Sequence, residues 1–217
     1  DDIWGIPILT QPQVIKIADD FARLHGAIKF FDAGDVQANG FQIVEDNSPE
    51  ETFTDSGSSY MGFAVSALLS QALANKGCYS IALTGDGSFM MNPQILIDGI
   101  QHGVHGTILL LDNRRMAAIS QLQEAQYSCA YRTNDVVEVD YVKMAQSIKG
   151  IRALWGGTNL KDLKKVLVEA YAHSGLSLIH VPVYHGLNPL GSMGAYGNWN
   201  VGNWCEEVQQ RYIETVI

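Results

Sequence analysis

The sequence is poor in cysteine and in positive charge. It has only 3 cysteines in 217 residues, and Cys78, Cys129 and Cys205 lie far apart without forming a CxxC pair. This pattern argues against a disulfide framework or a zinc knuckle and favours a reducing cytoplasm. Because 14 Lys and Arg stand against 23 Asp and Glu, the net charge is −9. The chain therefore lacks the basic stripe that nucleic acid or an anionic membrane surface would require.

Long hydrophobic runs are also absent. The longest apolar stretches have the length of a strand and are interrupted by glycine or charge, whereas a membrane helix needs roughly 20 apolar residues. The first residues, 1–4, lack the cationic start of a signal peptide. We therefore expect a soluble, unexported protein. A length of 217 residues, with 47% of them hydrophobic, is typical of one compact globular domain.

The sequence does contain a regular alternation of strand-length apolar runs and helix-length amphipathic segments. This alternation predicts an α/β fold with a doubly wound parallel sheet and helices on both faces, a Rossmann-like three-layer arrangement. The predicted strands cover residues 27–31, 79–84, 107–111, 151–155 and 176–183. The predicted helices cover residues 11–25, 61–74, 92–101, 114–124, 140–149 and 158–173.

Two stretches show neither a helical nor a strand period. Residues 37–59 are polar and are interpreted as a loop. Residues 186–204 are rich in Gly, Asn and Trp, which favours an ordered flap packed by its aromatic residues, with a flexible tail as the alternative. We accordingly divide the chain into a domain over 1–185 and a flap and tail over 186–217.

Polar loops follow the predicted strands at the edge where an open α/β sheet binds ligands. The segments 33–36, 85–88 and 112–113 each come directly after a strand. Asp86 lies between two glycines, which allow the backbone to approach a ligand closely, and Asn113 offers a neutral amide oxygen. One carboxylate, one amide oxygen and a backbone carbonyl suit Mg²⁺, with phosphate oxygens completing the coordination. The sequence thus predicts a metal and phosphate site here.

These residues resemble the signature of thiamin diphosphate-dependent enzymes, in which GDG is followed by roughly 24 to 27 residues and then by a pair of Asn. Here the GDG at 85–87 is followed by 24 residues and then by Asp112 and Asn113, so the metal-ligating Asn is retained. The MGF sequence at 61–63 begins 25 residues before Asp86 and is similar to a segment of acetolactate synthases. The resemblance covers about residues 10–185.

The resemblance implies a role for individual residues. Asp86, Asn113 and the backbone oxygen of Arg115 would hold the metal. The remaining cofactor-binding residues would be Gly34, Asp35, Val36, Gly85, Gly87 and Ser88 around the diphosphate, Ser59 and Met61 at the aminopyrimidine ring, and Ala118 and Ile119 under the thiazolium ring. Met61 would also hold the cofactor in its bent V shape. Ala118 and Leu122 stand where acetolactate synthases usually have Met and Trp, which bears on acceptor specificity.

The activity implied is that of the diphosphate-binding subunit or domain of a Mg²⁺-dependent enzyme, a lyase or transferase that decarboxylates or ligates 2-oxo acids as acetolactate synthases do. In that family the cofactor supplies a carbanion and an electron sink, and a Glu from a pyrimidine-binding domain activates it. No second domain fits in 217 residues, so no catalytic residue is assigned to this chain. The chain would then be either one subunit of a split enzyme or a domain or fragment of a longer one. We favour a pyrimidine-domain partner in a hetero-oligomer and expect a small carbonyl substrate.

Two other functions stay open. The segment 196–208 is similar in style to the closing segment of trihydroxycyclohexanedione hydrolases, which would mean C–C bond hydrolysis of a cyclic 1,2-dione. A non-catalytic assembly subunit that retains the fold is the second alternative. A nucleotide-binding Rossmann protein is disfavoured, because no GxGxxG follows a strand.

The other polar candidates carry weaker signals. His102 and His105 have no third ligand nearby, so we expect surface or capping roles. His185 follows the last strand and could reach a substrate, although a structural role is favoured. Arg114 and Arg115 could either pair with an acidic substrate or solvate the start of a helix.

Overall fold

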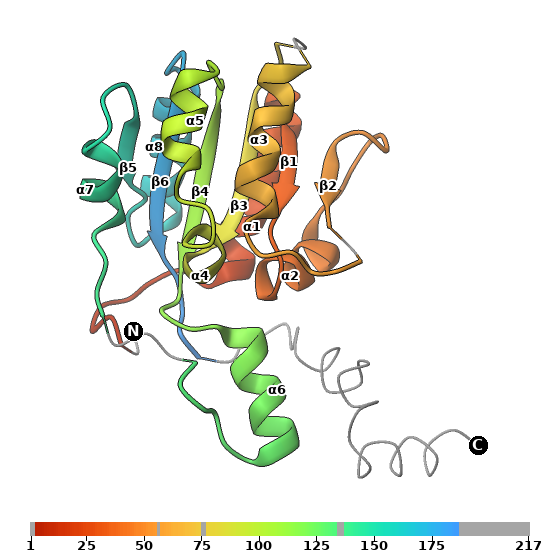
Figure 1. The fold of residues 1–217 in the computed structure, drawn as a ribbon, viewed down its shortest axis with the longest axis vertical. Helices are drawn as coiled ribbons and strands as arrows, with labels where there is room; N and C mark the ends of the chain where they lie inside the picture. Colours follow the sequence, from red (N-terminus) through yellow and green to blue (C-terminus); the bar gives the residue numbers. More distant parts are fainter. Residues whose placement is uncertain (1–2, 56, 75–76, 134–136, 187–217) are drawn as a thin grey trace.

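The alternating apolar segments form a six-stranded sheet with helices on both faces in the computed structural model of the chain (Figure 1). The structure describes residues 3–55, 57–74, 77–133 and 137–186. The strands are β1 (Ile28–Phe31), β2 (Thr52–Thr54), β3 (Ser80–Gly85), β4 (Gly106–Asp112), β5 (Arg152–Trp155) and β6 (Leu176–Pro182). They lie in the order β2-β1-β3-β4-β6-β5, and each neighbouring pair is parallel. The predicted doubly wound parallel sheet is confirmed.

Two hydrophobic layers fill the space between the sheet and its helices. The helices are α1 (Gln11–His25), α2 (Asp35–Ile43), α3 (Phe63–Leu73), α4 (Asp86–Phe89), α5 (Ile95–Gln101), α6 (Ala117–Tyr127), α7 (Tyr141–Gln146) and α8 (Leu160–Tyr171). Successive residues of β4 point to opposite faces, as the pleat of a strand requires. Ile108 and Leu110 pack with α3, α5 and α7, whereas Leu109 and Leu111 pack with α1 and α8. Both faces of the central strands are therefore buried.

Capping residues fix the ends of α1 as the sequence predicts. Thr10 accepts a hydrogen bond from the backbone N–H of Gln13, and the Gln13 side chain accepts one from the backbone N–H of Thr10. This reciprocal capping box satisfies donors that the first helical turn leaves unpaired. Gly26 ends the helix at a left-handed φ of 63°, which glycine adopts without steric cost. The bounds of α1 confirm the prediction over 11–25.

The prediction of a loop over 37–59 is wrong, because α2 and β2 lie in this stretch. The polar residues Gln37 and Asn39 are buried in α2, so the helix shows no apolar period. Gln37 donates to Thr54 Oγ1 at 2.6 Å, and Asn39 donates to Gln11 Oε1 at 2.5 Å. Buried side chains that are hydrogen-bonded replace the apolar stripe on which pattern reading depends.

A buried ion pair holds the start of β1. Lys29 is 1% exposed, and its Nζ lies 2.5 Å from Asp19 Oδ1 on α1 and 2.7 Å from Asp46 Oδ1. Asp46 lies in the segment between α2 and β2, so one ammonium group links three parts of the chain. A buried charge is tolerated only when it is paired in this way.

The carboxyl ends of the strands all point to one edge of the sheet. From β1 the chain runs to β2 on one side of it, and from β2 it crosses to β3 on the other side of β1. This reversal of strand order creates a topological switch point between β1 and β3. Figure 1 shows α6 standing beyond this edge, apart from the helices that cover the two faces. Among the described residues, no helix is long and apolar enough to cross a membrane. The predicted flap and tail lie outside the described residues, apart from Gly186.

Candidate functional site

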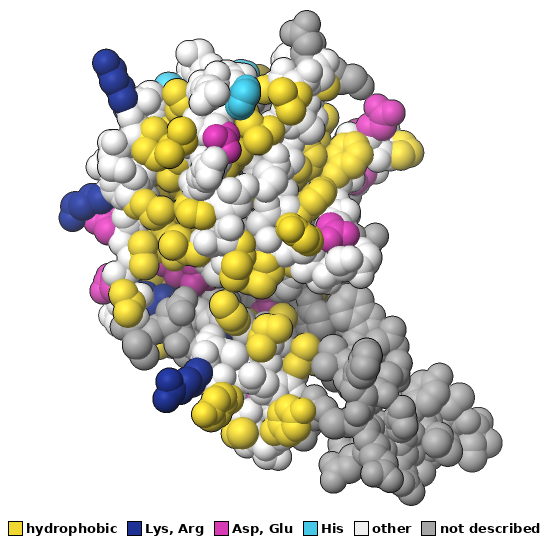
Figure 2. Space-filling model, viewed as in Figure 1, with side chains coloured by type: hydrophobic (Ala, Val, Ile, Leu, Met, Phe, Trp, Pro, Cys, Tyr) yellow, Lys and Arg dark blue, Asp and Glu magenta, His cyan; other side chains and the backbone are white. Residues whose placement is uncertain are grey.

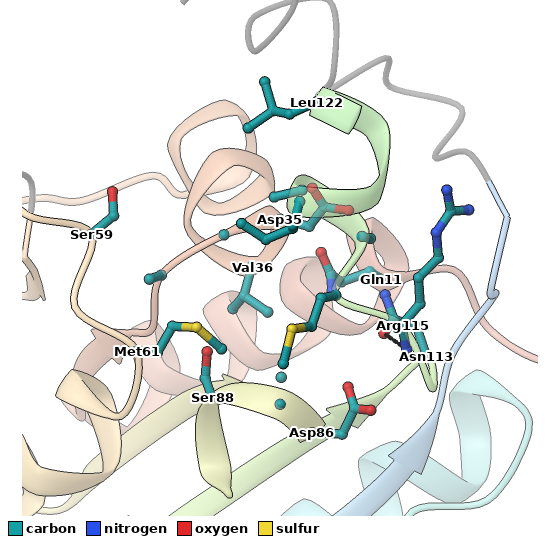
Figure 3. A pocket seen from close by; sticks show the side chains of 18 residues that line it. Gln11, Asp35, Val36, Ser59, Met61, Asp86, Ser88, Asn113, Arg115 and Leu122 are labelled. Atoms are coloured by element: carbon teal, nitrogen blue, oxygen red, sulfur yellow. Dashed lines mark hydrogen bonds between the residues drawn. The ribbon is translucent and has the colours of Figure 1, made fainter. Parts of the chain in front are cut away.

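A cavity of about 270 Å³ opens at the switch point between β1 and β3. All the residues that the sequence assigned to the site line this cavity, namely Gly34, Asp35, Val36, Ser59, Met61, Gly85, Asp86, Gly87, Ser88, Asn113, Arg115, Ala118 and Ile119. They come from four segments that are far apart in the sequence, and Figure 3 shows the labelled ones around a common space. The structure thus brings the predicted residues together.

The GDG segment forms the side of the cavity that is nearest the sheet. Asp86 begins α4 directly after β3 and is 3% exposed, and in Figure 3 it lies across the cavity from Asp35. A Cβ on Gly87 would lie 3.6 Å from Met61 Cε and 3.7 Å from Met116 Cγ. The two thioether side chains therefore lie at van der Waals distance from the space above Gly87.

The turn after β4 presents the oxygens of Asn113 and Arg115. The Arg115 backbone N–H donates to Asn113 Oδ1 at 3.0 Å, and Arg114 between them has a left-handed φ of 52°. His185 Nδ1 donates to the carbonyl oxygen of Asn113 at 2.7 Å. These contacts, including the one from His185 to the backbone, fix the conformation of the turn.

Asp112, which replaces the first Asn of the family signature, is held by a buried histidine. His180 Nε2 lies 2.8 Å from Asp112 Oδ2, and the backbone N–H of Arg114 donates to Asp112 Oδ1 at 3.0 Å. Both Asp112 and His180 are buried. The Asp is therefore fully engaged in supporting the turn, and it does not line the cavity.

One buried carboxylate links the loops on both sides of the switch point. Asp32, directly after β1, accepts hydrogen bonds from the backbone N–H of Gly62 at 2.7 Å and from Thr84 Oγ1 at 2.8 Å. Gly62 adjoins Met61, and Thr84 adjoins the GDG segment. Burial raises the pKa of Asp32, and the hydrogen bonds from Thr84 and Gly62 oppose part of that rise.

The carboxylate of Asp35 lies in the cavity with a strongly perturbed pKa. Asp35 is 8% exposed at the start of α2, and its Oδ1 has no hydrogen-bond partner. Burial raises the pKa of Asp35 from 3.8 to about 6, and the positive charge of Arg115 opposes that rise. A buried acid without a partner is disfavoured in its charged form, and such groups cluster at functional sites.

Both arginines beside the cavity are already paired. Arg114 Nη2 lies 3.0 Å from Glu138 Oε1, and Arg115 Nη2 lies 3.2 Å from Glu124 Oε1 on α6. Arg115 Nε also donates to Ser120 Oγ at 2.5 Å. Arg114 therefore connects the turn after β4 to the segment before α7, and Arg115 connects the same turn to α6.

Four lining residues had no individual assignment from the sequence, namely Gln11, Ala33, Met116 and Ala117, although Ala33 belongs to the predicted segment 33–36. The last three adjoin predicted residues, so their adjacency was a usable signal. Gln11 is distant in sequence, and no pattern in a single chain places the start of α1 at this edge. His102 and His105 are exposed and do not line the cavity, in line with the surface roles expected for them.

The residues present fit a magnesium ion bound together with a diphosphate. Among the described residues no group of three or more His, Cys, Asp or Glu could hold a metal. The donor set is instead one carboxylate, Asp86, with the Asn113 amide oxygen and the Arg115 carbonyl, so an anionic ligand has to complete the shell. Val36, Ala118 and Ile119 give the cavity apolar wall that a heteroaromatic ring requires. The fold and the cavity define an α/β domain with a ligand-binding cavity at the switch point of its parallel sheet.

Comparison with known proteins identifies the family of this chain. The family described as "Thiamine pyrophosphate enzyme, C-terminal TPP binding domain" matches residues 32–181, and thiamine pyrophosphate is another name for thiamin diphosphate. The chain belongs to this family, so the resemblance drawn from the GDG and MGF segments is confirmed.

Several curated relatives share a single name. The 3D-(3,5/4)-trihydroxycyclohexane-1,2-dione hydrolase of Bacillus licheniformis is 31% identical over 83% of this chain and 29% of its own length. The enzyme of that name from Lacticaseibacillus casei is 33% identical over 78% of this chain and 26% of its own length. The chain therefore spans less than a third of the length of these relatives.

A solved structure shows the same fold. The benzoylformate decarboxylase from Polynucleobacter necessarius superposes with a TM-score of 0.73 at 21% identity, over 87% of this chain and 35% of that chain. At this identity the likeness concerns the fold. It agrees with the six-stranded parallel sheet described above.

Proposed function

We propose that this chain is the diphosphate-binding part of a thiamin diphosphate- and Mg²⁺-dependent enzyme that hydrolyses a C–C bond of a hydroxylated cyclic 1,2-dione. The observation that carries the proposal is the similarity to trihydroxycyclohexane-1,2-dione hydrolases over most of the chain. It favours this reaction over the acetolactate synthase-like decarboxylation or ligation of 2-oxo acids, which was the main expectation from the sequence. Ala118 and Leu122 in the cavity wall, instead of Met and Trp, support the same choice.

The cavity residues divide into three groups toward the cofactor. Asp86, Asn113 and the Arg115 carbonyl would hold Mg²⁺. The backbone of Gly34–Val36, at the start of α2, and the GDG-Ser segment would bind the diphosphate, because backbone N–H groups at a helix start attract anions. Ser59 and Met61 would contact the aminopyrimidine ring, and Ala118 and Ile119 the thiazolium ring.

The cofactor, when bound, supplies a nucleophilic carbon and an electron sink. Hydrolysis between the two carbonyl carbons consumes one water, and one carbonyl becomes a carboxylic acid while the other becomes an aldehyde. The contribution of this chain is positioning. Asp32 fixes the loops that carry Met61 and Asp86, and His180 and His185 fix the turn that carries Asn113. Such fixed geometry supplies much of the rate enhancement of an enzyme.

The site requires a partner that carries the pyrimidine-binding domain, either as a separate chain or as the rest of a longer protein. Figure 2 shows apolar side chains on the face that carries α3 and α5, and Leu73 of α3 and Ile97 of α5 are exposed, as is Met91 between α4 and α5. Tyr60, Met61 and Met91 line a second hollow that adjoins the cavity. Exposed apolar side chains of this kind indicate an interface, which supports contact with a partner domain on a separate chain or on the same one. The cytoplasmic location expected from the cysteines stays a prediction.

The test uses the chain assembled with its pyrimidine-domain partner and loaded with thiamin diphosphate and Mg²⁺. The assembly is given 3D-(3,5/4)-trihydroxycyclohexane-1,2-dione or pyruvate, and products are followed by NMR. We expect a ring-opened acid aldehyde from the dione and no CO₂ from pyruvate. CO₂ release from pyruvate with the dione left intact would contradict the proposal and restore the 2-oxo acid reaction.

Two variants separate catalysis from a purely structural subunit. Asp86→Ala should abolish turnover while the far-UV circular dichroism and the assembly are unchanged. Asp98→Asn, on α5 and outside the cavity, is the matched control and should retain activity. A wild-type assembly that forms correctly but cleaves neither compound would favour a non-catalytic assembly subunit.

A further inference from the structure

Apart from the paired Arg115, two polar side chains in the cavity have no role in the proposed metal and cofactor site, to which Asp35 would contribute its backbone alone. They are the Asp35 carboxylate, at the start of α2, and the Gln11 amide, at the start of α1. Both are more than nine-tenths buried, at 8% and 3% exposed. Burying each of these polar side chains costs free energy of desolvation, which an apolar side chain in the same place would not cost.

The Asp35 carboxylate faces the cavity, and the charge of Arg115 offsets only part of the cost of its burial. Its Oδ1 accepts no hydrogen bond, and within the described part of the chain Asp35 forms no ion pair. The nearby cation, Arg115, is held by Ser120 and Glu124 on α6. Figure 3 shows Asp35 toward Leu122, on the opposite side of the cavity from Asp86. The carboxylate is thus available as a hydrogen-bond acceptor for a ligand.

The Gln11 amide is oriented by a neighbour. Asn39 Nδ2 donates to Gln11 Oε1 at 2.5 Å, and Asn39 is fully buried. With its carbonyl oxygen occupied in this way, the amide offers a ligand its NH₂ group, which is a donor. The cavity therefore has an acceptor at Asp35 and a donor at Gln11, and its lining also contains the apolar side chains of Val36, Ala118 and Leu122.

A hydroxyl group matches this pair, because one hydroxyl can donate to a carboxylate and accept from an amide at the same time. A carboxylate group on the substrate does not match, because, unlike a diphosphate held through Mg²⁺, it would bring an unneutralised charge beside Asp35 in a desolvated space. We propose that Asp35 and Gln11 form a substrate subsite that selects a ring hydroxyl and rejects the carboxylate of a 2-oxo acid. This inference rests on the proposed function and identifies residues that choose its substrate class.

The test measures how strongly the site prefers a hydroxylated ring. The complete assembly is loaded with Mg²⁺ and an unreactive deaza analogue of thiamin diphosphate, so that diones bind without turnover. Calorimetry then gives the affinity for 3D-(3,5/4)-trihydroxycyclohexane-1,2-dione and for cyclohexane-1,2-dione, which lacks the hydroxyls. A hydrogen bond to a charged group predicts a preference of about 10- to 100-fold for the hydroxylated ring.

The variants Asp35→Ala and Gln11→Leu test the two halves of the subsite independently. Each should remove most of the preference by weakening only the hydroxylated ring, while affinity for the unsubstituted ring and for the cofactor analogue is retained. Asp98→Asn should leave the preference unchanged. An equal loss for both rings, an unchanged preference, or a wild-type assembly that binds neither ring would each overturn the subsite.

The outcome also separates this inference from the proposed function. Turnover is measured on the same variants with thiamin diphosphate itself. A preference that depends on Asp35, without any ring opening, would support the subsite and contradict the hydrolysis. Ring opening with a preference that Asp35→Ala does not alter would support the hydrolysis and overturn the subsite.

Discussion

Replacing Asp35 by Asn should stabilise the protein at neutral and alkaline pH. Asn keeps the shape of the side chain but carries no charge to desolvate. Burial raises the pKa of Asp35 from 3.8 to about 6, so the fold favours the neutral acid. The stabilising contribution of the neutral acid is fully present below about pH 4 and is lost as the pH rises through about 6.

The magnitude follows from the size of that rise. A change from 3.8 to about 6 corresponds to about 3 kcal/mol between the two charge states. Relative to wild type, Asp35→Asn should therefore gain about 3 kcal/mol at pH 8 and less than about 1 kcal/mol at pH 4. For a domain of this size, 3 kcal/mol corresponds to a rise in Tm of roughly 6 to 12 °C.

The assay is urea unfolding followed by circular dichroism across this pH range, with Asp98→Asn as the control that should show no such trend. An Asp35→Asn variant that is no more stable than wild type at pH 8 would refute the reasoning, because the carboxylate would then have a partner that compensates its burial. A gain that follows pH as described would mean that the chain keeps a destabilising charge in its cavity, as functional sites often do.

Two further predictions concern buried polar groups that hold the frame of the site. Lys29→Met should lower the free energy of unfolding by about 3 to 5 kcal/mol, because it leaves Asp19 charged and unpaired. The double variant Lys29→Met with Asp19→Leu should recover much of that loss. Urea unfolding of both variants checks this, and a double variant no more stable than the single one would contradict it. Asp32→Ala should lower the free energy of unfolding by about 1 to 3 kcal/mol for each donor it leaves unsatisfied, at Gly62 and Thr84. It should also weaken thiamin diphosphate binding, measured by calorimetry. A stable variant with unchanged affinity would show that Asp32 does not position these loops.

Much of the fold could be predicted from the sequence because its strands are buried on both faces and its helices are amphipathic. β4 and β6 are apolar runs of strand length, and α1 carries a capping residue at one end and a glycine at the other. α2 was missed because its buried face carries Gln37 and Asn39, whose hydrogen bonds no periodicity reveals. The formation of α2 therefore depends on tertiary contacts and not on a local sequence pattern.

The candidate site divides in the same way. Asp86, Asn113 and Met61 are found from spacing, because the cofactor signature lies on loops directly after strands. Gln11 reaches the cavity only because α1 packs beside α2 in the folded chain. The sequence also placed Asp35 in the site, but its lack of a partner is a property of three-dimensional surroundings that the sequence does not encode locally.

The most direct test of the central claim is calorimetric titration of thiamin diphosphate, in the presence of Mg²⁺, into the complete assembly of this chain with its pyrimidine-domain partner. Wild type and Asp98→Asn should bind the cofactor equally, and binding should require the metal. Asp86→Ala should lose more affinity than the roughly 10- to 100-fold that follows loss of an outer-shell partner of a metal. Metal-independent binding, or equal binding by wild type and Asp86→Ala, would contradict the account.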